Sequence, residues 1–488
     1  MRAVVFVLCV FVLQMVCSPE CHADATRPNV VVLLVDDLGW ADLSCYGSTY
    51  YETPQLDQFA QQAVRFTNAY SAGSICSPTR ASLMTGRYPA RVGITDYIPG
   101  LRKPWQKLKM PDDLDALPSS ETTLAELFTQ AGYKSLYVGK WHLGNENAGP
   151  VEHGFTERIL DKDVGNWKRD PTVSDRYTDI VVKRIEENAK SSKQEPFLVY
   201  LSYHKVHIPI LPHPKTIAHF RDKKTDMKLE ETPPMPEHDQ GLTRAQQDDP
   251  DYASSLAAVD DSVGRILQAL ETTQQMKNTV VVFLSDNGGL STKNAPGPTN
   301  NHPLRAGKGW LYEGGIRIPM MIKAPDTKPG HLEQTPVITN DLLPTLASYA
   351  GIDLSDFTLD GVNIRPLLSG KPVSWQERPL FWHYPHYHGS TWKPGAAIRH
   401  GHWKLIEFYH EGVTELYDLS SDLGESHNLA NSRPDVVQRM QKQLTNWQAE
   451  IGAQFPTPNP NYDPQRADIV PPRKKPNTRR NPKTNPTK

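Results

Sequence analysis

Four short apolar runs, each followed at once by polar residues, constrain the fold of this chain more than any other feature of its sequence. Continuous apolar runs rich in Val, Leu and Tyr are typical of strands that are buried on both faces of a sheet. The runs cover residues 29–35, 134–138, 197–203 and 279–285. Segments with helical spacing lie between them, so the order of elements predicts a mostly parallel sheet covered by helices on both sides.

The helical segments carry recognisable start signals. Thr53 and Pro54 supply a cap and a first-turn proline, and Ser120 precedes a second helix that we expect to end at Gly132. Two longer helices, with apolar side chains three and four residues apart, are expected over residues 175–189 and 252–270.

The sequence changes character near residue 378, where short aromatic and β-branched segments predict a small antiparallel sheet. We expect a catalytic domain over 26–377 and an α+β subdomain over 378–455, with a helix at about 434–451 packed on the sheet. The tail 456–488 is rich in Pro, Asn, Lys and Arg and is expected to be disordered. A charged stretch at about 221–251 is expected to be a long surface excursion near the cleft or a partly mobile loop.

The first residues are typical of an export signal. A positive start at Arg2 precedes an apolar run to about residue 16, and small residues surround a cleavage point near Ala23. We expect a signal peptide over 1–23 and a mature protein in the periplasm or outside the cell. No later run is apolar enough to span a bilayer. The formal net charge of −2 gives no field that would attract nucleic acid.

The chain has 5 cysteines, too few for a disulfide framework in an exported protein. Three lie in or beside the signal peptide, where neither Cys17 nor Cys21 follows a convincing lipobox. Counting alone would pair the other two, Cys45 and Cys76, in a disulfide. However, Cys76 precedes a helical pattern with an early proline, and the positive end of a helix favours a thiolate or a bound anion. A conventional cysteine nucleophile is therefore open on residue types alone.

Polar clusters follow all four predicted strands, at residues 36–37, 140–142, 204–207 and 286–287. Open α/β sheets bind ligands beyond the carboxyl ends of their strands, so these clusters are expected to share one cleft. Three carboxylates and an amide stand among them, namely Asp36, Asp37, Asp286 and Asn287. Such hard oxygen donors suit Ca²⁺ or Mg²⁺, and calcium is preferred because it accepts irregular oxygen cages.

The segment from Cys76 to Arg87 resembles the signature of the formylglycine-dependent sulfatases of the alkaline phosphatase superfamily. The resemblance rests on Cys76-x-Pro78-x-Arg80 and on the continuation Ser-Leu-Met-Thr-Gly-Arg. Five further motifs occur in the family's order, at residues 36–37, 139–142, 207–209, 286–289 and 307–315. The resemblance implies an alkaline-phosphatase-like fold. It also implies that a formylglycine-generating enzyme oxidises Cys76 to formylglycine (3-oxoalanine), which leaves Cys45 unpaired and buried.

The same resemblance implies the roles of the cleft residues. Calcium would bind Asp36, Asp37, Asp286 and Asn287 together with residue 76, whose hydrated aldehyde, a geminal diol, would attack sulfur and later expel sulfate. The supporting roles are that Arg80 steadies the diol, Lys140 and Lys308 hold sulfate oxygens, His142 handles the diol proton and His207 protonates the leaving oxygen. Cations and histidines suit these tasks, because the sulfuryl group carries negative charge and protons must move near neutral pH.

Further residues are candidates for the substrate side of the cleft. His204 is expected to contact the substrate or to support a residue that does. His302 and Arg305 are cleft candidates for which a structural role is equally open, and Ala306 stands where the family often has glycine. The aromatic segment 381–388 is expected either to line the rim and stack on sugar or aryl rings, or to join the two domains.

The expected substrates are sulfate esters, with aryl sulfates as assay compounds and sulfated carbohydrates or polysaccharides as natural targets. One rival is a phosphatase or phosphoryl transferase that uses unmodified Cys76 or a metal-bound water. Zinc chemistry would demand histidines among the metal ligands, and the predicted set contains none. Another rival is an inactive protein that binds sulfated glycans through its basic tail. The complete set of catalytic residues argues against it.

Overall fold

The computed structural model describes residues 27–471 except 231 and 238–240. Its centre is a mixed sheet with the strand order β13-β2-β12-β10-β1-β7-β5-β6. The strands are β1 (Asn29–Val35), β2 (Val64–Phe66), β5 (Lys134–Gly139), β6 (Glu157–Ile159), β7 (Phe197–Ser202), β10 (Thr279–Ser285), β12 (Met320–Lys323) and β13 (Leu332–Glu333). The four predicted runs are the adjacent parallel strands β10, β1, β7 and β5. β12 runs antiparallel to both of its neighbours.

The central strand β1 shows why these runs are apolar throughout. Its alternate residues Val30, Val32 and Leu34 enter one hydrophobic core, whereas Val31, Leu33 and Val35 enter a second core on the other face of the sheet. Side chains of a strand point alternately to the two faces, so a strand between two helical layers needs apolar residues at every position.

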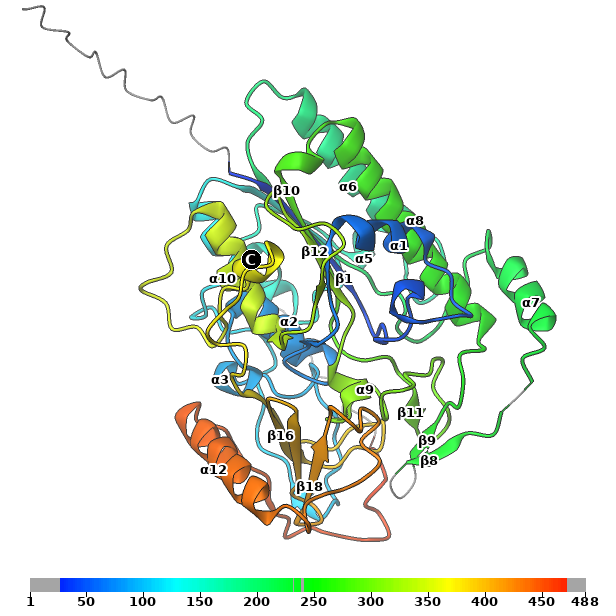
Figure 1. The fold of residues 1–488 in the computed structure, drawn as a ribbon, viewed down its shortest axis with the longest axis vertical. Helices are drawn as coiled ribbons and strands as arrows, with labels where there is room; N and C mark the ends of the chain where they lie inside the picture. Colours follow the sequence, from blue (N-terminus) through cyan, green and yellow to red (C-terminus); the bar gives the residue numbers. More distant parts are fainter. Residues whose placement is uncertain (1–26, 231, 238–240, 472–488) are drawn as a thin grey trace, which may run out of the picture.

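Helices cover both faces of the sheet (Figure 1). One core contains residues of α1 (Pro54–Gln62), α6 (Val173–Lys190) and α8 (Pro250–Thr272). The other contains residues of α2 (Cys76–Thr85), α4 (Leu124–Gln130) and α10 (Leu342–Ala350). The expected mostly parallel sheet between helical layers is thus confirmed.

The helix expected after Ser120 begins later, because Thr123 caps α4. The Thr123 hydroxyl accepts a hydrogen bond from the Glu126 backbone, and the Glu126 side chain accepts one from the Thr123 backbone in return. The structure also contains the short elements β3 (Ala69–Tyr70), α3 (Pro89–Val92), α5 (Asp161–Val164), α9 (Glu313–Ile316), β14 (Val337–Ile338) and α11 (Arg365–Leu368). Single-turn 3-10 helices span η1 (Ser44–Tyr46), η2 (Glu146–Ala148), η3 (Val151–His153), η4 (Met276–Asn278) and η5 (Thr339–Asp341).

The charged stretch before α8 carries regular structure. It holds the end of α7 (Ile217–Asp226) and the strands β8 (Met235–Glu237) and β9 (Gly241–Thr243). β9 also pairs with β11 (Thr292–Lys293), which follows the active-site end of β10. The excursion therefore reaches the neighbourhood of the predicted cleft.

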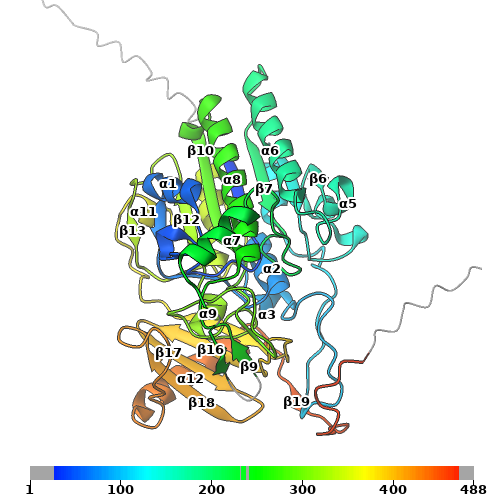
Figure 2. The same ribbon diagram turned by 90° about the vertical axis from the view of Figure 1, so that its right-hand side faces the viewer.

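The C-terminal subdomain is an antiparallel sheet with one long helix, as expected (Figure 2). Its elements are β15 (Leu380–Tyr384), β16 (Gly395–His400), β17 (Trp403–Phe408), β18 (Val413–Asp418) and α12 (Pro434–Glu450). A third hydrophobic core joins this sheet and α12 to residues of the large domain, including Tyr70 and Trp310.

The beginning of the tail differs from the disorder expected for 456–488. β19 (Thr457–Pro458) pairs antiparallel with β4 (Leu108–Lys109), and the two segments run side by side in Figure 2. The Asn459 amide donates to the carbonyls of Pro104 and Gln106 at 2.9 and 2.7 Å. Composition alone indicated disorder, because the residues that order this segment lie about 350 positions earlier in the sequence and composition does not reveal them. Residues 472–488 and the predicted signal peptide lie outside the described residues.

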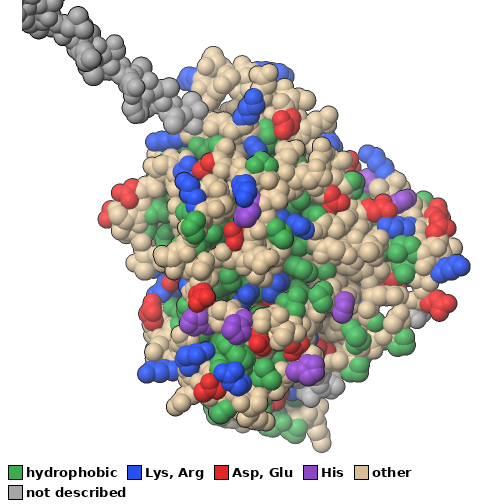
Figure 3. Space-filling view, viewed as in Figure 1, with side chains coloured by type: hydrophobic (Ala, Val, Ile, Leu, Met, Phe, Trp, Pro, Cys, Tyr) green, Lys and Arg blue, Asp and Glu red, His purple; other side chains and the backbone are tan. Residues whose placement is uncertain are grey.

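On the face shown in Figure 3, basic and acidic side chains are interspersed, in keeping with the net charge of −2. Among the described residues, no helix is long and apolar enough to cross a membrane.

Candidate active site

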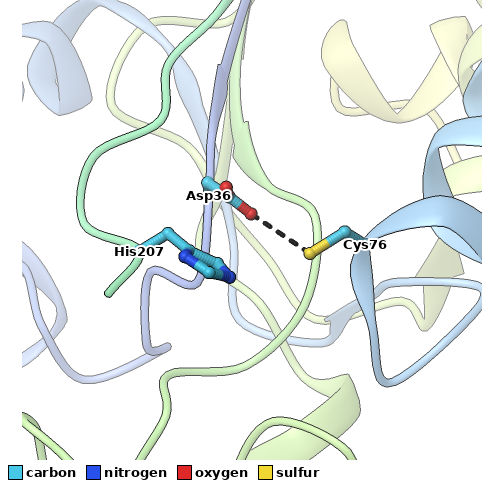
Figure 4. A group of neighbouring side chains, drawn as sticks. All are labelled: Asp36, Cys76 and His207. Atoms are coloured by element: carbon cyan, nitrogen blue, oxygen red, sulfur yellow. Dashed lines mark hydrogen bonds between the residues drawn. The ribbon is translucent and has the colours of Figure 1, made fainter. Parts of the chain in front are cut away.

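The polar clusters converge at one edge of the sheet, where β1, β5, β7 and β10 end and α2 begins. The Cys76 sulfur lies 3.3 Å from a carboxylate oxygen of Asp36 (Figure 4). Ligand atoms of Asp36, Asp37, Cys76 and Asp286 all lie within 4.8 Å of one another. The parallel order of the strands produces this convergence, because equivalent strand ends meet at one edge.

Cys76 is the first residue of α2 and is 2% exposed. It is unpaired, which excludes the disulfide that cysteine counting suggests. Cys45 is also unpaired, although it is half-buried rather than buried. Burial raises the pKa of the Cys76 thiol to about 12, and the Asp36 carboxylate adds to the shift. An unmodified thiol in this position would be protonated near neutral pH, which disfavours a plain thiolate nucleophile.

Two lysines flank the sulfur. The Lys140 and Lys308 ammonium nitrogens lie 3.3 and 3.5 Å from the Cys76 sulfur. Lys140 also lies 2.5 Å from Asp36, and Lys308 lies 2.7 Å from Asp37. Burial would raise the pKa of Asp36, but Lys140 and other nearby cations hold it well below its usual value. Residue 76 thus sits between two cations, where a bound anion would be stabilised.

Arg80, which lies one helical turn after Cys76, organises the carboxylates instead of contacting the sulfur in this structure. Its guanidinium donates to Asp286 at 2.7 Å and to the hydroxyl of Ser202 at 2.6 Å. It also donates to the backbone carbonyl of Lys140 at 2.9 Å. Ser202, the last residue of β7, was missed by the sequence analysis because a lone serine at a strand end carries no distinctive signal.

The chemistry of the donor set fits a hard divalent cation. Asn287 donates from its amide nitrogen to Asp37 at 2.9 Å, while its amide oxygen is buried with no hydrogen-bond partner. A buried acceptor normally has a hydrogen-bond partner. An unpartnered amide oxygen beside three carboxylates is therefore consistent with a cation ligand. A second possible set, Asp36, Cys76 and His207, is less enclosed because His207 is half-buried. The oxygen-rich set favours Ca²⁺ or Mg²⁺.

Two residues of the site, Asp37 and His142, adopt left-handed backbone conformations that are rare outside glycine. Asp37 has φ 62° and His142 has φ 58°. The Asp37 amide donates to Asp286 at 3.2 Å, and the Ser77 hydroxyl donates to the His142 carbonyl at 2.8 Å. Such conformations cost on the order of 1–3 kcal/mol and persist where surrounding contacts hold them.

His142 and His207 line the same hollow as Cys76, as does His388 from the C-terminal part of the chain. His142 places Nε2 2.7 Å from the carbonyl of Ile98, so Nε2 donates, and its buried Nδ1 has no partner. Burial and then Lys140 lower the His142 pKa well below its usual value. His207 lies 3.8 Å from Asp37, and burial together with Lys308 lowers its pKa to about 4. Both rings are therefore neutral near pH 7 and line the hollow that contains Cys76.

The remaining candidates lie farther out. His204 donates from Nε2 to the Asp161 carboxylate at 2.6 Å and stacks on Trp167 with ring centroids 4.3 Å apart. It lines a hollow of about 530 Å³ together with Lys140, His142 and His207. Trp167 and Asp161 were missed because only the folded chain brings them to His204.

The structure does not bring His302 to the site. His302 is exposed, whereas its neighbour Asn301 is buried and donates to the carbonyls of Gly289 and Ala306. Arg305 has a structural role, because it pairs with Glu237 at 2.7 Å and donates to the Glu425 carbonyl.

The aromatic segment 381–388 both lines the hollow and joins the two domains, while its stacking on sugar or aryl rings stays a prediction. His388 lines a hollow of about 260 Å³ together with Cys76, Tyr97 and Lys308. Trp382 is buried and donates from its indole nitrogen to the carbonyl of Ser71, which joins the two domains. His388, at the end of the segment, therefore lines the site, whereas Trp382, in strand β15, belongs to the core.

The sheet architecture and the strand-end cluster define a hydrolase with the alkaline-phosphatase-like fold. The family model for "Sulfatase" matches residues 28–352, and the model for "N-sulphoglucosamine sulphohydrolase, C-terminal" matches residues 306–450. The chain belongs to the sulfatase family and is a sulfuric ester hydrolase.

Individual relatives agree with this assignment. A sulfatase from Formosa agariphila is 31% identical, with 88% of this chain and 90% of that protein covered. Arylsulfatase A from Homo sapiens is also 31% identical, over 88% of this chain and 89% of the relative. Among solved structures, Ps i-CgsB superposes with a TM-score of 0.72 at 26% identity, over 90% of this chain and 95% of the other. Ps i-CgsB has also been solved in complex with k-i-k-neocarrahexaose.

Proposed function

We propose that this sulfatase removes sulfate from carbohydrate esters, using a formylglycine formed from Cys76. The carrying observation is the placement of Cys76 at the positive end of α2, between Lys140 and Lys308 and beside three carboxylates. A cationic, enclosed position around one oxidisable residue suits transfer of an anionic sulfuryl group. The raised thiol pKa supports a modified residue over a plain cysteine.

A divalent cation, proposed to be Ca²⁺, would be held by Asp36, Asp37, Asp286 and Asn287 together with modified residue 76. When bound, the cation would offset negative charge on the sulfate and favour ionisation of a hydroxyl on residue 76. The unpartnered Asn287 oxygen supports this set. A readout that needs no turnover is available, because added Ca²⁺ should raise the thermal midpoint of the protein, and Asn287→Ala should weaken that effect.

The hydrate of formylglycine would supply one hydroxyl that attacks sulfur and a second whose deprotonation expels sulfate. Lys140 and Lys308 are proposed to hold the sulfate oxygens, because both ammonium groups already lie within 3.5 Å of the residue 76 sulfur. Arg80 would steady the hydrate indirectly, by fixing Asp286 and the end of β5.

Two proton transfers are assigned to histidines. His142 is proposed to take the hydrate proton through Nδ1, since Nε2 already donates to the Ile98 carbonyl. His207, which lines both hollows, is proposed to protonate the ester oxygen as it leaves, because the negative charge of a bound sulfate would raise its pKa from about 4. His204 would support the substrate side of the cleft through Asp161 and Trp167.

Sulfated carbohydrates are the proposed substrate class. Ps i-CgsB, which shares the fold at 26% identity, has been solved with a carrahexaose, and the hollow of about 530 Å³ beside Lys140 is large enough for a sugar ring. Aryl sulfates should serve as small assay substrates. The export signal expected over residues 1–23 would place the enzyme in the periplasm or outside the cell, where it would meet such polymers.

The maturation step is tested directly by mass spectrometry of the peptide that contains Cys76. We expect the mass of the aldehyde when the chain is produced with a formylglycine-generating enzyme. Because Cys76 is 2% exposed, that enzyme must reach it before the domain folds. Cys76→Ala should remain folded and lose hydrolysis of 4-nitrophenyl sulfate. An unmodified cysteine in an enzyme that still turns over sulfate esters, or preference for 4-nitrophenyl phosphate, would contradict the proposal.

A further inference from the structure

The hollow at Cys76 has a neighbouring hollow of about 390 Å³, and His388 and Gly389 line both. We call the second one the outer hollow and define it by Lys103, Tyr387, Lys393, His410, Tyr462 and Asp468. Its walls come from the loop before β4, from the segment after β15, from the turn after β17 and from the tail after β19. Apart from Tyr387, which belongs to the aromatic segment 381–388, none of these residues was assigned a role by the sequence motifs.

The tail forms a fixed wall of the outer hollow. The Asp463 amide donates to the Trp105 carbonyl at 3.1 Å, and the Arg466 guanidinium lies 3.6 Å above the Trp105 ring. Lys103 pairs with Asp468 at 3.2 Å. These contacts add to the β4–β19 pairing, so the tail holds Tyr462 and Asp468 in place beside the loop.

The chemistry of the outer hollow fits an anionic sugar. Two lysines, Lys103 and Lys393, line it against one carboxylate, Asp468. Lys393 pairs with Glu411 at 2.7 Å, but both side chains are partly solvent-exposed, and such pairs are weak enough to exchange for a ligand anion. Tyr462 is 48% exposed, and an exposed aromatic face can stack on a sugar ring.

A further hollow beside the same loop is richer in carboxylates than the outer hollow. Its volume is about 550 Å³, and it meets the hollow beside Lys140 at Ile98. Four carboxylates line it against three cations, Arg102, Lys103 and Lys109; the carboxylates are Asp96, Asp112, Asp113 and Asp115. Burial raises the pKa of Asp96 to about 7 and that of Asp113 to about 6, so this hollow is only weakly acidic near neutral pH.

We propose that the outer hollow is a subsite for an anionic sugar residue next to the one whose sulfate is hydrolysed. The subsite rests on the proposed function, since it extends the same substrate beyond the reacting residue. Lys393 and Lys103 bind the sulfate or carboxylate of the neighbouring sugar, and Tyr462 packs on its ring. The enzyme accordingly recognises an oligosaccharide and not only a single sulfated sugar.

The test is direct binding, measured by calorimetry in a Cys76→Ala background so that no probe is consumed. The probes are a carrageenan hexasaccharide, a chondroitin sulfate hexasaccharide, the desulfated carrageenan hexasaccharide and D-galactose 4-sulfate. We expect one sulfated hexasaccharide to bind about tenfold more tightly than both the desulfated chain and the monosaccharide. The double variant Lys393→Gln/Tyr462→Ala should remove that advantage. Lys109→Gln, which deletes a cation from the acidic hollow, is the matched control and should leave binding unchanged.

Thermal midpoints that stay within the range of the parent show that each variant is folded. Equal binding of hexasaccharides and monosaccharide overturns the subsite, as does a double variant that keeps the advantage or a Lys109→Gln loss of equal size. Failure of the proposed function has a different signature, because it would appear as absent 4-nitrophenyl sulfate hydrolysis in the protein with intact Cys76, whatever the binding results.

Discussion

Among the described residues, two buried clusters of acids and bases are connected by one loop. Lys308 belongs to the cluster at Cys76, whereas Glu313, five residues later, belongs to a cluster between the two domains. In the second cluster Lys404 is completely buried and lies 3.0 Å from Glu313 and 2.8 Å from Glu425. Burial of charge is therefore common to the active site and to a domain joint.

What differs is access and the groups at the centre. The cluster at Cys76 opens into hollows, surrounds an oxidisable residue and contains left-handed backbone at Asp37 and His142. The joint cluster is closed by Arg317, which pairs with Glu313 at 2.6 Å, and by Tyr70, which donates to the same carboxylate. Buried ion pairs mark function only where a ligand can reach them, because a closed network serves to fix geometry.

The largest expected effect is on stability, from Lys404→Met in the joint cluster. The variant leaves Glu313 and Glu425 without their shared cation, and removing one partner of a buried ion pair costs about 3–5 kcal/mol. Denaturant unfolding measures the loss. Turnover of 4-nitrophenyl sulfate per folded molecule should change little in comparison.

The control for Lys404→Met is the double variant Lys404→Met/Glu425→Gln. Burial raises the pKa of Glu425 to about 7, so this carboxyl is the one that becomes neutral at least cost. The double variant should regain part of the lost stability. A single variant that unfolds normally but loses turnover would mean that the joint cluster belongs to the catalytic machinery.

Lys308→Met should show the opposite pattern. Loss of one group that stabilises developing charge in a transition state lowers kcat by about 10²–10³-fold. With Ca²⁺ present, Asp37 keeps a positive partner, so the free energy of unfolding should fall less than in Lys404→Met. Stopped assays with 4-nitrophenyl sulfate and unfolding curves in the same buffer separate the two effects. A Lys308→Met enzyme with normal kcat would remove this lysine from the sulfate site.

These clusters also show how far the sequence leads. The apolar runs predicted β1 and β10 with their exact ends, because strands buried on both faces carry a dense local signal. Motif order predicts that Asp36, Cys76 and Asp286 lie together, and the structure brings them together. The partners of Arg80 and His204 were not predictable, since they depend on how separate loops meet.

The misplaced predictions have the same physical origin. His302 stood near Lys308 in the sequence, yet a local turn exposes it and buries Asn301 instead. The tail looked disordered by composition, but a few backbone hydrogen bonds and the Arg466–Trp105 contact order residues 456–471 against a distant loop. Composition reports how much apolar surface a segment can bury by itself, and not what another segment offers it.

A smaller, pH-dependent effect is expected from the segment that follows β15. His386 is 2% exposed, and burial followed by His383 lowers its pKa to about 3. The unfolded chain binds a proton near pH 6.5 while the folded chain does not, so stability is lost as pH falls from about 6.5 toward 3. Between pH 7 and 5 this residue alone should cost about 2 kcal/mol.

His386→Gln should flatten that acid limb of the stability profile, measured by denaturant unfolding at several pH values. The substitution keeps a hydrogen-bonding group opposite Thr95, whose hydroxyl lies 2.8 Å from His386 Nε2. His331→Gln is the control, because His331 is only half-buried and lies 3.3 Å from Glu333, away from His386 in the sequence. This variant should leave the pH slope unchanged. An unchanged pH slope in His386→Gln would place the acid sensitivity elsewhere.

The smallest expected effect concerns Ala306, which begins the loop that connects the two clusters. Ala306 has φ 55°, where a side chain costs about 1–2 kcal/mol, so Ala306→Gly relieves strain. The gain is offset by about 0.4–1 kcal/mol of added freedom in the unfolded chain and by loss of one buried methyl group, about 0.8 kcal/mol. The net change in unfolding free energy should thus be below about 1 kcal/mol.

The control is Ala347→Gly in the buried helix α10, where no backbone strain is relieved, so the free energy of unfolding should fall by about 2 kcal/mol. Equal losses at the two positions would mean that the loop holds residue 306 without strain, and that Lys308 and Glu313 are positioned by their ion pairs alone.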